Sequence, residues 1–257
     1  TFLARAKTRY GYRAQYLGER GAAFAYSKRF ARFEGFNAWD GLRKTVSEAL
    51  GYPLVGHAQF DLQLPRQSAA LMPASGGSYA MFFHATSSEQ KKWPVANWQA
   101  LGRRLLERGV RVVLPWGSDA ERACAQAIAS GIPDAVVLPR LSIEEVAQWI
   151  SRSCLVVGTD TGFVHLASAV MKPTVMIFTA TSRPHFGVDV PGYARSVGDE
   201  GRPPELMEVD EAIAHVCPWL RAPAATLIEG ASADPIASAS EQTPAHRHAE
   251  TPHIKTF

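Results

Sequence analysis

Between residues 79 and 179, short apolar runs alternate with longer amphipathic segments, and this alternation restricts the possible fold more than any other feature. The apolar runs predict strands at 79–85, 110–117, 135–139, 155–159 and 174–179. The amphipathic segments predict helices at 95–109, 119–131, 142–153 and 162–171. Strands that alternate with helices indicate βαβ units and a parallel sheet, and uniformly apolar strands indicate helices on both faces. The sequence therefore predicts an α/β fold built on an open parallel sheet.

Upstream of this alternation the pattern is less regular. An amphipathic segment at 37–50 predicts a helix, with Asn37 as its N-cap and Gly51 as its stop. We expect a further helix near 22–33 and, from polar–apolar alternation, a half-buried strand at 58–64. The apolar face of the helix at 37–50 is formed by Leu42, Val46, Ala49 and Leu50.

A stretch rich in Pro, Ser and Gly at 65–78 marks the predicted boundary between two domains. We expect a partial N-terminal α/β domain at 1–70 and a ligand-binding domain at 71–221, whose last helix covers 205–220. More than half of residues 222–257 are Ala, Ser, Thr or Pro, which predicts a disordered low-complexity tail.

Positive charge is concentrated at the N-terminal end, where residues 1–32 hold eight Lys and Arg residues and one acidic residue, Glu19. Such a block suits nucleic acid, a phospholipid surface or a phosphorylated glycolipid, and it is equally typical of a solvated helix face. The three cysteines are widely spaced and form no CxxC pair, which favours a reducing cytosol over a disulfide framework. No apolar run reaches the length that a membrane-spanning helix needs.

Polar side chains follow the predicted strands at the point where each strand ends. In an open parallel sheet these positions share one edge, where ligands bind at helix N-termini. The string "TDTGFVH" places Asp160, Thr161 and Gly162 where a strand meets a helix, a geometry that offers backbone N–H groups to an anion. Glu121, after the second strand, suits the vicinal hydroxyls of a ribose. The other candidates, after the first strand, are Thr86, Ser87 and Lys91. The set predicts a nucleotide-diphosphate site.

Simpler interpretations of the same residues remain open. Asp160 and Thr161 are also ordinary helix N-caps. His165 could be a satisfied core histidine, and Lys91 and Lys92 could be solvated charges. No GxGxxG or P-loop pattern follows a strand, which argues against dinucleotide and P-loop sites, and the histidines are too scattered to hold a metal.

Four strings give the chain a family resemblance. "FFHATSSEQKKWP", "LPWGSDAE", "LPRLSIEEVA" and "VVGTDTGFVHLASAV" occur in this order. Their order and spacing resemble the C-terminal half of the ADP-heptose:lipopolysaccharide heptosyltransferases of glycosyltransferase family 9. The likeness runs from about Asn37 to Leu220, and the "HAT…K.WP" form is closer to the type I members than to type II. The resemblance implies a GT-B architecture, in which a C-terminal Rossmann-like domain binds ADP-heptose and an N-terminal α/β domain, expected to be incomplete here, binds the acceptor.

For the nucleotide end of the donor, the resemblance implies specific contacts. Thr86 and Ser87 would meet the phosphates, with Ser87 in place of a commoner Thr, and Lys91 would meet a phosphate or the heptose. Glu121 would hold the ribose. The backbone of Leu141, where the family usually has Met, would contact the adenine.

For the sugar end, the resemblance implies that Asp160 binds heptose hydroxyls. Thr161 and Gly162 would contact the diphosphate. His165 would support the loop that carries them.

By the same resemblance, the reaction is an inversion without metal or cofactor, in which an Asp of the N-terminal domain deprotonates the acceptor. We expect that base upstream of Thr1, because neither Asp40 nor Asp61 matches its motif position, and we assign no catalytic residue. Arg20 and Arg43 suit the acceptor side, the anionic Kdo sugars of lipid A. The resemblance further implies a monomer in the cytoplasm, peripheral on the inner membrane, with no nucleic-acid partner.

Two other functions compete with heptose transfer. One is nucleotide-sugar binding without transferase activity, which the sequence allows because the base is not assigned. The other is a membrane or nucleic-acid binder built on the basic N-terminal segment. Binding of ADP-heptose would favour the first over the second.

Overall fold

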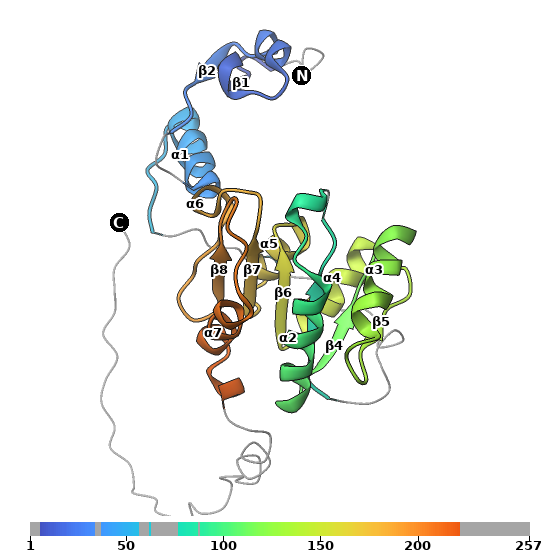
Figure 1. Ribbon diagram of the computed structural model, residues 1–257. Helices are drawn as coiled ribbons and strands as arrows, with labels where there is room; N and C mark the ends of the chain where they lie inside the picture. The colour runs from blue at the N-terminus through green and yellow to red at the C-terminus, as the bar shows by residue number, and fades with distance from the viewer. Residues whose placement is uncertain (1–5, 34–36, 57–61, 63–76, 87, 222–257) are drawn as a thin grey trace, which may run out of the picture.

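The computed structural model describes residues 6–33, 37–56, 62, 77–86 and 88–221. Its centre is a six-stranded sheet with the order β5-β4-β3-β6-β7-β8, and every neighbouring pair is parallel (Figure 1). The strands are β3 (Tyr79–Phe83), β4 (Arg111–Leu114), β5 (Val136–Val137), β6 (Leu155–Thr159), β7 (Thr174–Phe178) and β8 (Ala194–Gly198). The main helices are α2 (Val95–Glu107), α3 (Asp119–Ala129), α4 (Ile143–Arg152), α5 (Gly162–Ala169), α6 (Arg183–Phe186) and α7 (Leu206–Val216). The predicted α/β fold with a parallel sheet is confirmed.

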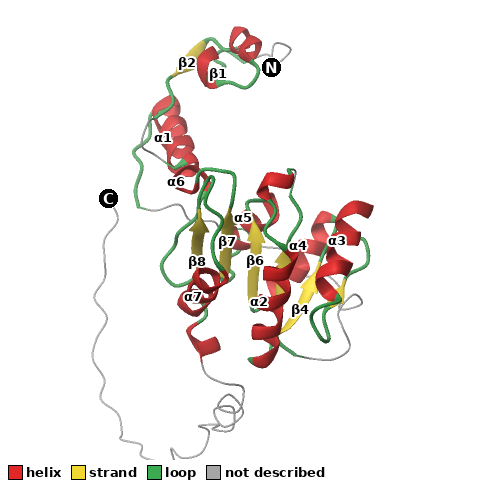
Figure 2. Cartoon of the chain, viewed as in Figure 1, coloured by secondary structure: helices red, strands yellow, loops and turns green. Residues whose placement is uncertain are grey.

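The helices cover both faces of the sheet, as the apolar strands predict (Figure 2). Helices α2, α3 and α7 pack on one face, and α4 and α5 pack on the other. Alternate residues of β3 point to opposite faces of the sheet. Ala80 and Phe82 pack in the core under α2, α3 and α7, and Met81 and Phe83 pack in the core under α4 and α5. Every residue of β3, β6 and β7 is buried, so the strands that position the loops at their carboxyl ends are held by packing on both sides.

The sequence pattern misses the edge strand β8 and the short α6 before it. In β8 the buried positions alternate with Arg195 and Val197, so the strand lacks the apolar run of its neighbours. Its outer edge is covered locally, because Val190 pairs with Ala194 and the Asp189 carboxylate accepts a hydrogen bond from the Ser196 N–H at 2.8 Å. The local pairing satisfies backbone groups that an open edge would leave unpaired.

Helix α7 begins where the sequence predicts the last helix, at Leu206 behind a capping box of Glu205 and Glu208. A second expectation from the sequence, that Asp210 caps this helix, is wrong. Asp210 lies inside the helix and accepts hydrogen bonds from Arg108, the C-cap of α2, at 2.6 and 2.9 Å. The carboxylate therefore joins two helices of one layer.

The N-terminal residues form a small separate unit. Two short parallel strands, β1 (Tyr10–Tyr12) and β2 (Lys28–Phe30), flank the 3-10 turns η1 (Ala14–Tyr16) and η2 (Arg20–Ala25). The helix predicted near residues 22–33 is wrong. Ser27 holds the chain extended there, because its hydroxyl accepts from the Arg9 N–H at 2.8 Å.

Helix α1 (Ala38–Leu50) confirms the predicted helix at 37–50 and its two ends. The Asn37 side chain accepts a hydrogen bond from the N–H of Trp39, and Gly51 stops the helix with a φ of 72°. The apolar face is not in the core, however, since Leu42, Val46 and Leu50 are 53%, 45% and 65% exposed. Instead α1 meets the sheet domain through its N-terminus.

Several predictions fall partly or wholly on residues that the structure does not describe. They are the strand at 58–64, the boundary at 65–78 and the tail at 222–257. The division into domains at 1–70 and 71–221 stays a prediction. Another observation concerns membranes: no helix in the described ranges is long and apolar enough to cross one.

Candidate functional site

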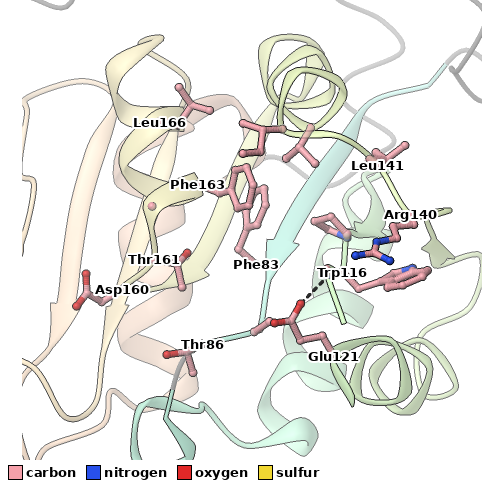
Figure 3. A pocket seen from close by; sticks show the side chains of 16 residues that line it. Phe83, Thr86, Trp116, Glu121, Arg140, Leu141, Asp160, Thr161, Phe163 and Leu166 are labelled. Atoms are coloured by element: carbon pink, nitrogen blue, oxygen red, sulfur yellow. Dashed lines mark hydrogen bonds between the residues drawn. The ribbon is translucent and has the colours of Figure 1, made fainter. Parts of the chain in front are cut away.

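A cavity of about 940 Å³ lies at the carboxyl edge of the sheet, where the predicted polar residues gather (Figure 3). The predicted residues that line it are Thr86, Glu121, Leu141, Asp160, Thr161 and Gly162. Lys91 and His165 do not line the cavity but pair with Asp160, and Ser87 is outside the described residues. Figure 3 shows Asp160 at one end of the cavity and Trp116, Arg140 and Leu141 at the other, with Glu121 beside this second group and the two threonines between Glu121 and Asp160.

The wall between these polar groups is apolar and partly aromatic. Phe83 and Phe163 stack with ring centroids 5.3 Å apart, and Leu166 lies beside them. At the other end, the indole of Trp116 donates to the Leu138 carbonyl at 2.6 Å, which fixes the ring plane. A slot of this kind suits a planar base. The sequence analysis missed these rings because they resemble ordinary core residues.

Trp116 and Arg140 also line the cavity and were not predicted. Both follow strands, at the positions where the sequence analysis found only Glu121 and Leu141. The guanidinium of Arg122 lies 5.3 Å from the centre of the Trp116 ring. Arg140 directly follows the strand predicted at 135–139, and this position was the signal that could have identified it. Trp116 gave no such signal, because the strand predicted at 110–117 includes it, whereas β4 ends at Leu114.

Glu121 has its carboxylate held in place by the backbone. It belongs to a capping box at the start of α3, and its Oε2 accepts from the N–H groups of Gly117 at 2.6 Å and Ser118 at 3.3 Å. No described residue donates to Oε1, so this oxygen is the one available for a ligand hydroxyl. Below it, Nε2 of the buried His84 lies 3.1 Å from the Glu121 carbonyl oxygen. Burial lowers the pKa of His84, which keeps this support neutral.

The N-terminus of α5 opens toward the cavity. Its N-cap residue is Thr161, whose side chain makes no capping hydrogen bond, so the interpretation of Thr161 or Asp160 as a simple cap is wrong. The hydroxyl oxygens of Thr161 and Thr86 are buried and find no partner among the described residues. A Cβ added at Gly162 would meet no atom within 4 Å. N–H groups, hydroxyls and open space at a helix start are what an anion requires.

Asp160 is the most connected polar group of the site. Its Oδ2 accepts from the Thr181 hydroxyl at 2.8 Å, and Nζ of Lys91 lies 3.6 Å away. Its Oδ1 lies 3.3 Å from Nε2 of His165, and because a carboxylate only accepts, that nitrogen carries the proton. Burial raises the pKa of this carboxyl, but the imidazole, the hydroxyl and the ammonium outweigh burial and hold the pKa below its ordinary 3.8.

The two neighbouring lysines have different surroundings. Lys91 pairs with Asp160 at the cavity. Lys92 pairs with Glu89 on the surface, which raises the pKa of that ammonium group. The interpretation as a solvated charge therefore holds for Lys92 alone. His165 is not a core histidine either, since 24% of its side chain is exposed and it bonds to a carboxylate.

The residues predicted for the acceptor side lie away from the cavity. Arg20 is exposed at the start of η2. Arg43 of α1 pairs with Asp40 at 3.5 Å and donates to the Gly56 carbonyl at 3.3 Å. In the part of the chain that the structure describes, no group of three or more His, Cys, Asp or Glu side chains could hold a metal ion.

Known proteins resemble the chain in sequence and in fold. It is 38% identical over 167 residues to lipopolysaccharide heptosyltransferase 1 of Pseudomonas aeruginosa. The aligned region covers 61% of this chain and 46% of that protein. It is 31% identical over 160 residues to the Escherichia coli protein of the same name, covering 62% and 50%. The chain spans about half the length of these curated relatives.

Solved structures agree with the sequence comparison. The E. coli heptosyltransferase WaaC with ADP superposes with a TM-score of 0.64 at 26% identity, covering 82% of this chain and 66% of that one. A family 9 glycosyl transferase from Veillonella parvula shares the fold, with a TM-score of 0.60 at 13% identity, covering 88% and 67%. These neighbours confirm the predicted GT-B fold class.

A family model described as glycosyltransferase family 9 (heptosyltransferase) matches residues 1–203, which is more than half of the chain. The match includes Thr86, Glu121 and Asp160. The resemblance read from the four strings is thereby confirmed, and the chain belongs to glycosyltransferase family 9, the heptosyltransferases.

Proposed function

We propose that the cavity binds ADP-heptose and that the protein transfers the heptose in lipopolysaccharide core biosynthesis. The observation that carries the proposal is the order of groups along one cavity. An aromatic slot lies beside Glu121, the hydroxyls of Thr86 and Thr161 follow with the start of α5, and Asp160 lies at the far end. This order matches the order of base, ribose, diphosphate and sugar in a nucleotide-sugar.

Each end of the donor meets a group of suitable chemistry. The free oxygen of Glu121 accepts from a ribose hydroxyl, and the backbone of Leu141 borders the base. The diphosphate meets the α5 N-terminus with Gly162, where N–H groups and the helix dipole favour negative charge. Asp160 accepts from heptose hydroxyls. The E. coli relative solved with ADP supports the nucleotide part of this assignment.

We propose a single displacement that inverts the anomeric centre. The acceptor hydroxyl gives its proton to a base and attacks the heptose anomeric carbon, the bond to the diphosphate oxygen breaks, and ADP leaves with the electron pair. The α5 N-terminus, the Thr161 hydroxyl and Lys91 stabilise the charge that develops on ADP. Because these groups supply the positive charge, we propose that no metal takes part. We assign no general base.

For the acceptor we propose the Kdo region of lipid A. The charge that supports this lies in residues 1–32, where Lys and Arg outnumber acidic residues eight to one. Arg20 and Arg43 are the proposed contacts, and Arg43 would have to leave Asp40 to reach an anionic sugar. A monomer attached to the cytoplasmic face of the inner membrane would bring these residues to the lipid.

The first test is calorimetric titration of the chain with ADP-heptose, ADP and UDP. Glu121→Gln keeps the shape of the side chain and removes its charge, and it should weaken ADP binding about 10-fold, the effect of one charge-assisted hydrogen bond. Glu145→Gln is the matched control, because Glu145 occupies the same capping-box position on α4 and does not line the cavity. Equal losses in both variants would contradict the site.

The second test separates the competing functions. Transfer is measured with ADP-heptose and a Kdo–lipid A acceptor, with the release of ADP as the readout. Binding of ADP-heptose without transfer would favour a nucleotide-sugar-binding protein. No response to ADP, together with RNA binding that weakens steeply with salt, would instead favour a basic nucleic-acid binder.

A further inference from the structure

The loop between β7 and α6 carries a residue that bonds to Asp160, the carboxylate at the sugar end of the cavity. Thr181 donates its hydroxyl hydrogen to Oδ2 of Asp160 at 2.8 Å, the shortest of the contacts to that carboxylate. It lies in the loop after β7, the strand next to β6, twenty-one positions along the chain from Asp160. It does not line the cavity, so it affects a ligand through its partner.

We infer that Thr181 is a positioning residue that sets the selectivity of the cavity for the donor sugar by fixing the orientation of Asp160. The inference rests on the proposed function, in which Asp160 accepts from the hydroxyls of the heptose. Thr181 thus contributes to the affinity for ADP-heptose and not to the affinity for ADP.

The loop is fixed on both sides of Thr181. Two residues earlier, the Thr179 hydroxyl donates to the Gln90 carbonyl at 2.9 Å. Two residues later, the N–H of Arg183 donates to Asp199 at 3.0 Å. Across the strands, the Asp160 N–H donates to the Ile177 carbonyl at 3.1 Å. The hydroxyl and the carboxylate therefore meet between two braced backbones and lose little freedom when they bond.

The three partners of the carboxylate are arranged on different sides. His165 holds Oδ1, whereas Thr181 and Lys91 both approach Oδ2. A carboxylate has about four lone-pair directions, so the occupied ones leave a restricted direction for a sugar hydroxyl. Without the threonine hydroxyl, the ammonium of Lys91 becomes the only donor at Oδ2 among the described residues. The carboxylate is then free to turn toward Lys91, away from the direction in which the sugar approaches.

The test compares ADP-heptose and ADP binding by the chain and by Thr181→Val, which keeps the shape and removes the hydroxyl. We expect ADP-heptose to bind about 5- to 30-fold more weakly, no more than the loss of one hydrogen bond to a charged group because Thr181 acts only through Asp160, and ADP to change less than about 2-fold. Thr181→Ser should restore most of the ADP-heptose affinity. Thr174→Val is the control for loss of a threonine hydroxyl, because Thr174 donates to the Lys172 carbonyl at the opposite end of β7.

A double-mutant cycle tests whether Thr181 changes the ADP-heptose affinity through Asp160. If Thr181 acts only through Asp160, then Thr181→Val should cause no further loss of ADP-heptose affinity in an Asp160→Ala background. An additive loss, or an equal loss for ADP and ADP-heptose, would overturn the inference. Thermal unfolding of each variant, together with the serine variant, identifies any misfolded protein.

Different results would contradict the proposed function and the inference about Thr181. If the unaltered chain binds ADP-heptose no better than UDP, the proposed function is wrong and the inference falls with it. If the unaltered chain binds ADP-heptose and Thr181→Val binds it equally well, only the inference is wrong.

Discussion

A substitution of Gly158 by Ala tests whether the cavity rests on the tight contact between β6, β3 and α5. Gly158 pairs with Phe83 of the neighbouring strand. A Cβ added to it would lie 2.5 Å from Cγ2 of Val164, 2.7 Å from Cβ of Phe83 and 3.0 Å from the Phe83 carbonyl oxygen. The atoms on Phe83 cannot rotate away, so relief requires that the strands part or that α5 moves outward. Over-packing of this kind costs about 1–3 kcal/mol of the free energy of unfolding.

That free energy corresponds to a fall in melting temperature of roughly 2–12 °C for a domain of this size. Thermal unfolding of the whole chain, followed by circular dichroism, measures it. The matched control is Gly162→Ala, in which the added Cβ meets no atom within 4 Å. At the start of α5 an alanine should leave the melting temperature unchanged or raise it. It should still weaken ADP binding, because its methyl group occupies the proposed phosphate approach. A shift under about 1 °C for Gly158→Ala would refute the packing argument.

Two further predictions concern stability. Asp210→Ala should lower the free energy of unfolding by about 1–2 kcal/mol, since it leaves the partly buried Arg108 and Arg104 without their shared carboxylate; urea unfolding measures this, and an unchanged midpoint would contradict it. His84 has a pKa held below 6.5 by burial, so the unfolded chain binds a proton that the folded chain does not, and stability should fall as pH drops below 6.5 toward the folded pKa. His84→Gln keeps a donor for the Glu121 carbonyl and should flatten that part of the stability–pH profile; parallel profiles for the two proteins would show that another group titrates.

The sheet could be predicted because its central strands are buried on both faces. Residues such as Val156 and Val157 point into different cores, so the whole segment must be apolar and is visible in the sequence. The edge strand β8 lacks that requirement, because one side of it carries the exposed Arg195. For helix α1 the sequence predicted burial that the structure does not show. Its apolar periodicity predicts a buried face, yet Leu50 is 65% exposed, because periodicity says which residues share a face and not what covers them.

The site was predictable to the extent that it follows from topology. Parallel strands bring their carboxyl ends to one edge, so Thr86, Glu121 and Asp160 could be placed at that edge from the predicted parallel sheet alone. The hydrogen bond between Asp160 and Thr181 could not be predicted from the sequence, because it depends on the register of β6 and β7 and on the hydrogen bonds that fix the loop after β7. The sequence also could not predict that the two oxygens of Glu121 have different roles, with Oε2 bound by backbone N–H groups and Oε1 left available.

The contacts between the N-terminal segment and the sheet domain fall at one end of the cavity. Asn37 donates to the Gly187 carbonyl at 2.6 Å, and Arg32 bonds to the ring of His185 at 3.0 Å, both beside α6. Trp39 lies 5.7 Å from the ring of His165, which in turn holds Asp160. These contacts adjoin the loops that follow β6 and β7, and among the described residues none of the three involves the Glu121 end. A transferase needs its acceptor near the anomeric carbon of the donor, so an N-terminal segment docked on the sugar side is where the proposed reaction requires it.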